Sequence, residues 1–275
     1  MKSSWMIARL TTCVAVILLI GSVRSSAAPS AFEQEARTIG QAVPESIDRL
    51  RQLADGGDAN AQADLGFRYL QGRGVTRNDA EAVRWFRKAA EKGNSAAQVN
   101  LGGMYDQGWG VPQNYSEAIR WYLKAANQGV PLGQYYVGSM YDLGHGVPQD
   151  YAEAVRWYLK AAEQGVGLAQ TYLGGMYDQG RGVPQDYAEA AKWFHKAAEQ
   201  GMALAQFVLG TMYEEGTAGG SHDYVQAHMW VNLAASRASG DAQKKYADYR
   251  DRLAREMTAQ QIAEAQRLAR EWRPK

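Results

Sequence analysis

Four acidic residues recur along this chain at intervals of 36, and carboxylates in such a row could serve in catalysis or in the binding of a basic partner. They are Asp106, Asp142, Asp178 and Glu214, and each directly follows a tyrosine. Neighbours in this acidic row would lie roughly 10 Å apart on packed helices, which fits the paired carboxylates of a glycosidase poorly. Spaced along one groove, they would instead favour a basic or amino-bearing partner. The alternative interpretation is that they are solvated residues near a helix end, copied passively by duplication.

The other reactive groups show no arrangement that supports catalysis or metal binding. The four histidines have no metal-ligand spacing, and a zinc site needs three or four convergent ligands. The only cysteine, Cys13, lies in an apolar leader, so a chain without that leader has no thiolate chemistry. The sequence contains no Ser-x-x-Lys, no Gly-x-Ser-x-Gly and no phosphate-binding glycine loop. We therefore expect no catalytic residues, no metal and no cofactor.

The acidic row belongs to a larger repeat that must position it. A Leu-Gly or Val-Gly pair, a tyrosine four residues later and a tryptophan further on recur with the same period of 36, except that the last tryptophan, Trp230, comes one residue late. The pairs start at Leu65, Leu101, Val137, Leu173 and Leu209. A fixed period between about 20 and 50 residues is typical of a solenoid, in which each unit buries its apolar face against its neighbours.

Each unit is predicted to be a helical hairpin. In residues 168–201, Leu173 and Tyr177 follow helical spacing, and glycines then suit the end of this first helix, helix A. Asp186 is expected to cap the second helix, helix B, with Glu189 at the reciprocal position. We expect small residues to bring the two helices close together, while the tyrosine and tryptophan rings fill the remaining space. The recurring tryptophans are therefore predicted to lie in the core: Trp85, Trp121, Trp157, Trp193 and Trp230.

Both ends of the repeat region differ from its interior, as the caps of a solenoid should. Residues 44–56 look like an unpaired B helix, and Thr258 with Gln261 forms a capping box that opens a last helix. The predicted fold is all-α: a right-handed α-solenoid of about five helix-turn-helix repeats with capping helices at both ends. The predicted segments are a signal peptide at 1–28, an extension with the first capping helix at 29–58, the repeats at 59–240 and the C-terminal capping helices at 241–275.

The first 28 residues are predicted to be a secretory signal. Lys2 and Arg9 supply positive charge, residues 10–21 form an apolar stretch, and cleavage is expected after Ala27 or Ala28. The apolar stretch is short for a membrane span of about 20 residues, and an uncleaved anchor is the alternative. We expect the protein to be periplasmic or secreted, with no stable membrane insertion after cleavage.

The best-preserved units carry a specific motif. Residues 133–165 and 169–201 nearly match Ala-x-x-x-Leu-Gly-x-Met-Tyr-x-x-Gly-x-Gly-Val-Pro-Gln-Asp-Tyr, followed by Trp-Tyr-x-Lys-Ala-Ala and a glycine. In these residues the chain resembles the Sel-one-like repeat family, a branch of the tetratricopeptide-like helical solenoids. The resemblance implies a non-enzymatic adaptor that holds peptides, proteins or envelope components on a superhelical surface.

The resemblance also implies where a ligand would lie. By analogy with the tetratricopeptide fold, helix A lines the concave face, and two of its rows would touch a partner. One row includes Tyr135 and Phe207, and the other is the acidic row. Trp109, in a Gly-Trp-Gly turn, is a candidate anchor for a partner, and it could equally lie flat on the neighbouring hairpin.

The sequence thus predicts an exported scaffold that binds a protein or peptide, or an envelope polymer, through its concave surface. With 30 basic and 29 acidic residues, the chain offers no strong field for nucleic acid. One alternative is an envelope hydrolase that acts on β-lactams or peptidoglycan. A cysteine-rich branch of the family is associated with β-lactams, but this chain lacks the disulfide cysteines of that branch. A further alternative is a purely structural spacer between two envelope proteins.

Overall fold

The computed structural model describes residues 46–274 of the chain. The predicted signal peptide at 1–28 and the first part of the extension that follows it lie outside the described residues. None of the helices described is both long enough and apolar enough to cross a membrane.

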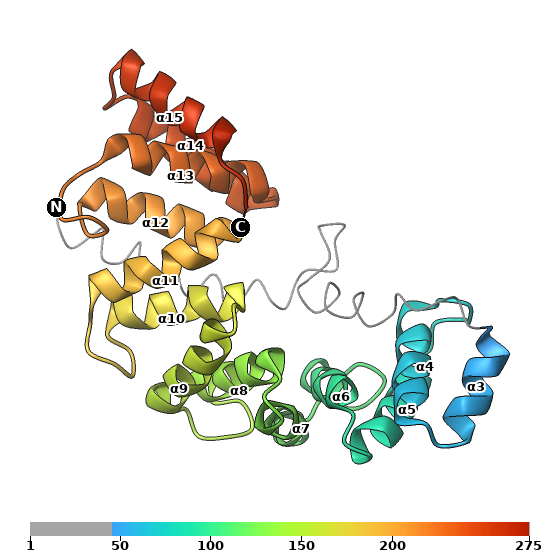
Figure 1. The fold of residues 1–275 in the computed structure, drawn as a ribbon. Coiled ribbons are helices and arrows are strands. Elements are labelled where there is room, and N and C mark those ends of the chain that lie inside the picture. The colour runs from blue at the N-terminus through green and yellow to red at the C-terminus, as the bar shows by residue number, and fades with distance from the viewer. Residues whose placement is uncertain (1–45, 275) are drawn as a thin grey trace. The chain divides into compact units, whose positions relative to one another are not determined.

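Thirteen helices and no strand make up the described residues (Figure 1). Five hairpins pair an A helix with the B helix after it, and single helices stand at both ends. The A helices are α4 (Ala59–Gln71), α6 (Ser95–Gln107), α8 (Pro131–Leu143), α10 (Gly167–Gln179) and α12 (Ala203–Glu215). The B helices are α5 (Asp79–Glu91), α7 (Tyr115–Asn127), α9 (Tyr151–Glu163), α11 (Tyr187–Glu199) and α13 (Tyr224–Arg237). The capping helices are α3 (Ile47–Asp55), α14 (Gly240–Ala254) and α15 (Ala259–Glu271). The prediction of an all-α solenoid with capping helices at both ends is confirmed.

Polar side chains start each B helix at the predicted residue. Asp186 accepts hydrogen bonds from the backbone amides of Ala188 and Glu189, which have no partner within the helix. The equivalent caps in the other hairpins are Asn78, Asn114, Asp150 and Asp223. A complete capping box, in which the Gln261 side chain also accepts a hydrogen bond from the backbone amide of Thr258, lies at the start of α15. Each A helix ends at a glycine with a left-handed backbone, so the chain turns after the same number of residues in every unit.

The two helices of a hairpin approach closely at the glycine of the Leu-Gly pair. A Cβ atom placed on Gly138 would lie 2.7 Å from the ring of Tyr158, closer than real atoms pack. Phe86, Tyr122 and Phe194 occupy the same position against Gly66, Gly102 and Gly174. In these four hairpins the ring beside the glycine belongs to the residue after the tryptophan, which was not among the rings predicted to fill the space between the helices.

The tryptophans lie in the core or at its edge. Four of the five are buried, but Trp157 is only half-buried, so its assignment to the core is only partly right. A lysine three residues further along the helix places its Nζ atom 3.8 to 4.0 Å from the centre of the tryptophan ring in four repeats. This cation–π contact covers the outer face of the ring while leaving the ammonium group in water.

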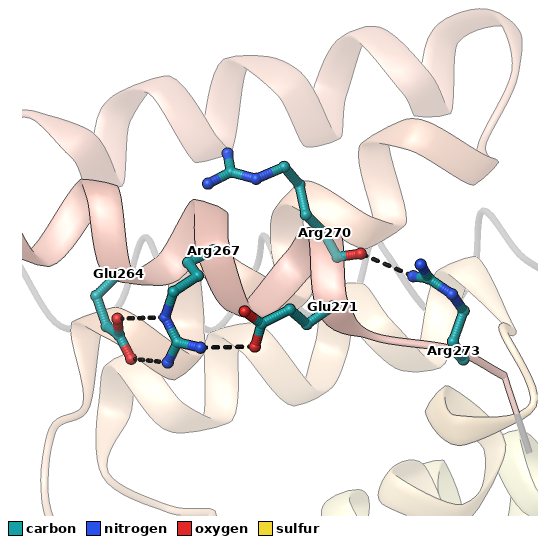
Figure 2. A network of polar contacts seen from close by, with 5 residues as sticks. All are labelled: Glu264, Arg267, Arg270, Glu271 and Arg273. Carbon is teal, nitrogen blue, oxygen red and sulfur yellow. Dashed lines mark hydrogen bonds and ion pairs between the residues drawn. The ribbon is translucent and has the colours of Figure 1, made fainter.

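The capping helices cover the two apolar ends of the described repeats. At the N-terminal end, Leu50 and Ala54 of α3 join a buried cluster with Leu65 and Trp85. At the C-terminal end, the apolar face of α15 packs on the core around Trp230 through Ala265, Leu268, Ala269 and Trp272. The opposite face of α15 is polar, and Arg267 there pairs with Glu264 and Glu271 (Figure 2). Such exposed pairs contribute little to stability, so the apolar face holds α15 in place.

Candidate functional site

The acidic row lies at the C-terminal end of the A helices, where the loop to helix B begins. In three repeats a glutamine of that loop donates a hydrogen bond of 2.7 Å to the backbone carbonyl of the acidic residue. The donors Gln113, Gln149 and Gln185 serve Asp106, Asp142 and Asp178 respectively. These three members of the row are thus fixed in the same way, whereas His222 contacts the backbone carbonyl of Glu214.

Asp142 is held by a residue of the following repeat. Its side chain is almost fully buried, and Arg181 lies 3.0 Å away in the loop after α10. The same guanidinium lies over the ring of Tyr151, 4.2 Å from its centre. A carboxylate on one side and an aromatic ring on the other thus enclose Arg181, an arrangement that suits a planar cation.

One repeat earlier, the same positions hold a histidine. The imidazole of His145 stacks on the ring of Tyr115, with 4.1 Å between ring centres and 20° between planes. Burial raises the pKa of the Asp106 carboxyl, while its hydrogen bond with Gln107 and the charge of His145 act in the opposite direction. Two successive loops therefore place a planar nitrogen-containing group between the acidic row and the first residue of the preceding B helix. We call this arrangement the loop clamp.

Charge pairing also sets the properties of Asp142. Burial raises the pKa of this carboxyl, and the Arg181 charge and the Tyr158 hydroxyl oppose that rise. Arg181 is itself about one-third exposed. The pair is therefore a structural contact between two repeats, and its carboxylate is already engaged within the chain.

Replacing Arg181 by methionine should lower the free energy of unfolding by about 2 kcal/mol at pH 7, because Asp142 would stay buried without its cation. Loss of the cation raises the pKa of Asp142 further, whereas the unfolded carboxyl keeps its ordinary value. The deficit relative to the wild type should therefore shrink between pH 7 and pH 5, as the native carboxyl takes up a proton. Urea titrations at both pH values measure this.

Arg156→Met is the control for that variant, because the Arg156 side chain is 75% exposed and pairs with Glu153 on the same helix. Its expected cost is below about 0.5 kcal/mol. Equal losses for the two variants, or a deficit that does not change with pH, would contradict the role assigned to Arg181.

The last member of the acidic row serves the C-terminal cap. Arg252 of α14 binds both carboxylate oxygens of Glu214 at 2.9 Å, and the Tyr249 hydroxyl donates to the same group. A carboxylate held by two parallel hydrogen bonds is firmly oriented. Glu214 therefore joins α12 to α14.

The two aromatic candidates of helix A lie inside the chain. Tyr135 is buried beside Tyr158 and Tyr172, with 5.9 Å between ring centres in both cases. Phe207 is buried and stacks on Tyr246 of α14, with 4.3 Å between ring centres. Their assignment to a binding surface stays a prediction, and this burial favours a packing role.

Trp109 is exposed, with 37% of its surface open to water. Its loop lies against the start of α5, since a Cβ atom on Gly110 would be 2.4 Å from the carbonyl oxygen of Asp79. Asp79 stands at the position of Tyr115 and Tyr151, so it offers no ring to stack on. The role of Trp109 as an anchor stays a prediction, and its exposure favours that role over packing on the neighbouring hairpin.

Sequence reasoning missed the tyrosines that start the B helices. Tyr115, Tyr151 and Tyr187 belong to the recurring Gln-Asn-Tyr or Gln-Asp-Tyr sequence, but no role was predicted for them. The available signal was that each stands 30 residues before a histidine, an arginine or a threonine of the next loop. Within the described part of the chain, no three His, Cys, Asp or Glu residues are grouped to hold a metal ion.

The chain is similar to known repeat proteins. The family model described as the Sel1 repeat matches residues 59–94, 95–130, 131–166, 167–202 and 203–239. Among solved structures it is similar to a Sel1 repeat protein from Oxalobacter formigenes, with 34% identity, 70% of this chain and 76% of that chain covered, and a TM-score of 0.63. It is also similar to a protective antigen of uropathogenic Escherichia coli that displays an SLR fold, with 29% identity, 82% and 63% covered, and a TM-score of 0.43. No curated protein matches the chain.

Proposed function

Since the chain belongs to the Sel1 repeat family, whose members generally act as non-catalytic scaffolds for protein interactions, we propose that it binds a protein or peptide partner. The proposed surface is the edge formed by the loops after the A helices and by the first residues of the B helices. We call this surface the loop edge, and the acidic row borders it.

One observation carries this proposal. Among the residues described, the large apolar side chains that are exposed are Trp109 and Tyr187, and both lie on the loop edge. Exposed aromatic residues are favoured anchors in protein interfaces, because they bury a large area at a small entropic cost. The Asp106 carboxylate, three residues before Trp109, would favour partners with basic groups.

Export is part of the proposal. The sequence supports it through the positive charge of Lys2 and Arg9, the apolar stretch at 10–21 and the small residues around Ala28. The partner would then be met in the periplasm or outside the cell. Loss of Lys2, Arg9 and Arg24 with the leader leaves 27 basic against 29 acidic residues, so short-range contacts rather than net charge would govern recognition.

Site-specific crosslinking tests the proposal. A photoreactive residue at position 109 should capture a partner in the cells that make the protein, and the same residue at Lys244, on the exposed face of α14, should not. Trp109→Ala should then weaken the affinity for the captured partner about tenfold. The mass of the recovered chain should correspond to cleavage after Ala27 or Ala28.

Two results would overturn the corresponding parts of the proposal. Equal capture from positions 109 and 244, or unchanged affinity in Trp109→Ala, would remove the loop edge as the binding surface. A recovered chain that still begins at Met1 would remove cleavage of the leader.

A further inference from the structure

A pocket of about 460 Å³ opens between α13, α14 and α15, where the C-terminal cap meets the last hairpin. Residues four apart lie on one face of a helix, and two of the helices turn such a row of side chains toward the pocket. These are His228 and Asn232 of α13, and Ile262, Gln266 and Arg270 of α15. Most of these side chains are polar, so the pocket favours a ligand that can form hydrogen bonds.

Two charged residues of α14 at this pocket neutralise each other. The Arg250 guanidinium donates to one Asp251 carboxylate oxygen from Nε at 2.9 Å and from Nη2 at 2.7 Å. Its Nη1 atom donates to the Asn232 side-chain oxygen at 3.3 Å. Because all three nitrogens of Arg250 are engaged, this ion pair adds no net charge to the pocket.

Arg270 supplies a positive charge that the described residues leave unpaired. In Figure 2 its guanidinium points away from the ion pairs that Arg267 makes with Glu264 and Glu271. Its contact with Arg273 is made by the backbone carbonyl, and its guanidinium makes no hydrogen bond or ion pair within residues 46–274. Arg250 and Asp251 cancel, so the charge of the pocket is the single positive charge of Arg270.

His228 borders the same pocket from a buried position. It is 3% exposed, and its Nδ1 atom is buried without a hydrogen-bond partner among the residues described. Burial lowers the pKa of the imidazole, as does the charge of Arg250, while Asp251 acts in the opposite direction. The ring is therefore neutral at pH 7, with one donor and one acceptor nitrogen. A buried polar ring with incomplete hydrogen bonding, at the edge of a polar pocket, indicates a site that a ligand completes.

We propose that this pocket binds a carboxylate, held by the Arg270 guanidinium with the Gln266 amide and the His228 ring beside it. A carboxylate is planar and carries one negative charge, so it matches the fork of one unpaired guanidinium. A phosphate group carries more negative charge at neutral pH than Arg270 alone can offset. Ala254 and Ile262 offer apolar contact to a short aliphatic chain on the ligand. This site goes beyond the proposed scaffold function and does not depend on it.

Nuclear magnetic resonance of the full chain with labelled histidine rings tests the site at pH 7, with His228→Gln used to assign the signal. The probes are butyrate, with butyramide as its uncharged control, and acetyl-Ala-Ala with a free carboxylate, with acetyl-Ala-Ala-amide as its control. We expect a saturable shift of the His228 signal with a carboxylate probe and none with its amide. The signals of His145, His195 and His222 should stay in place.

The two carboxylate probes distinguish two sources of the same chemistry. Binding of butyrate would identify a free small carboxylate as the ligand, whereas binding of acetyl-Ala-Ala alone would identify the C-terminus of a peptide chain. Inorganic phosphate is expected to bind at least about threefold more weakly than the preferred carboxylate, because the pocket holds one unpaired positive charge.

Two exposed arginines of α15 provide a matched pair of variants. Arg270→Gln removes the unpaired charge and should weaken carboxylate binding about tenfold. Arg267→Gln, three residues earlier, removes a guanidinium that pairs with Glu264 and Glu271 and should leave the affinity unchanged. Arg270→Lys keeps the charge without the planar fork, so it should weaken binding only about threefold. Equal thermal midpoints for the Arg270→Gln and Arg267→Gln variants would show that both chains are folded.

Four results would overturn the inference: no saturable shift at His228 with either carboxylate, equal shifts with the amides, phosphate binding as tight as that of the carboxylates, or equal affinities in Arg270→Gln and Arg267→Gln. The outcome is separable from that of the scaffold function. Capture of a partner from position 109 tests the loop edge, and a carboxylate at His228 neither requires that capture nor replaces it.

Discussion

Replacing Tyr158 by alanine is expected to lower the free energy of unfolding by about 3 to 5 kcal/mol, because it empties the most enclosed aromatic position of the third hairpin. Tyr158 is 0% exposed, and its ring lies directly against Gly138. The ring also stacks with that of Tyr172 at 5.5 Å between centres. The surrounding side chains can fill this cavity only in part, because Gly138 has no side chain that could move into it. Urea unfolding followed by circular dichroism measures the loss.

Trp157→Ala is the control for this prediction, since it removes a larger side chain from the adjacent position of the same helix. Trp157 is half-buried and its outer face is covered by Lys160. Its truncation should cost less than half as much as that of Tyr158, because water can enter the space that the ring leaves. An equal or larger loss in Trp157→Ala would show that the tryptophan row, and not the residue after it, forms the centre of the core.

Replacing Gly182 by alanine should cost about 2 to 4 kcal/mol, from two causes that act together. The backbone at Gly182 has φ of +73°, which costs a residue with a side chain about 1 kcal/mol. The new Cβ atom would also overlap the carbonyl oxygen of Tyr151, which belongs to a helix and cannot move alone. We expect the loop to lift from α9 and Arg181 to leave Asp142, with a matching fall in the thermal midpoint.

Gly165→Ala separates these two causes. Gly165 has φ of +89°, but a Cβ atom there would meet nothing within 4 Å. Only the backbone cost of about 1 kcal/mol is expected. If the two alanine variants lost the same stability, the contact between Gly182 and Tyr151 would contribute nothing to the junction between repeats.

The helices could be predicted from the sequence because each carries its own start and stop. Asp186 caps α11 as predicted, and the helix expected at 44–56 is α3, Ile47–Asp55. The choice between two adjacent aromatic residues could not be made in the same way. Trp157 and Tyr158 both lie on the apolar side of their helix, and only the place of Gly138 on the facing helix decides which ring is enclosed.

The candidate site was predicted as a set of positions but not as a set of contacts. The period places Asp142 and Glu214 in one row, yet Arg181 and Arg252 reach them from elements 39 and 38 residues further along the chain. Whether residues so far apart along the chain meet in space depends on how one hairpin is offset from the next. A period reports that two units are alike, and it carries no information on that offset.

The loop clamp has a direction, and this explains why the exposed aromatic residues lie where they do. Each junction is a head-to-tail contact, in which a loop from one unit docks on the helix start of the unit before it, as in an open heterologous assembly. Such a series must have an unmatched member at each end. Trp109 is the loop that meets Asp79 instead of a ring, and Tyr187 is the ring that no arginine or histidine loop covers. The two exposed rings therefore mark the first and last positions of one series of contacts that all run in the same direction along the chain.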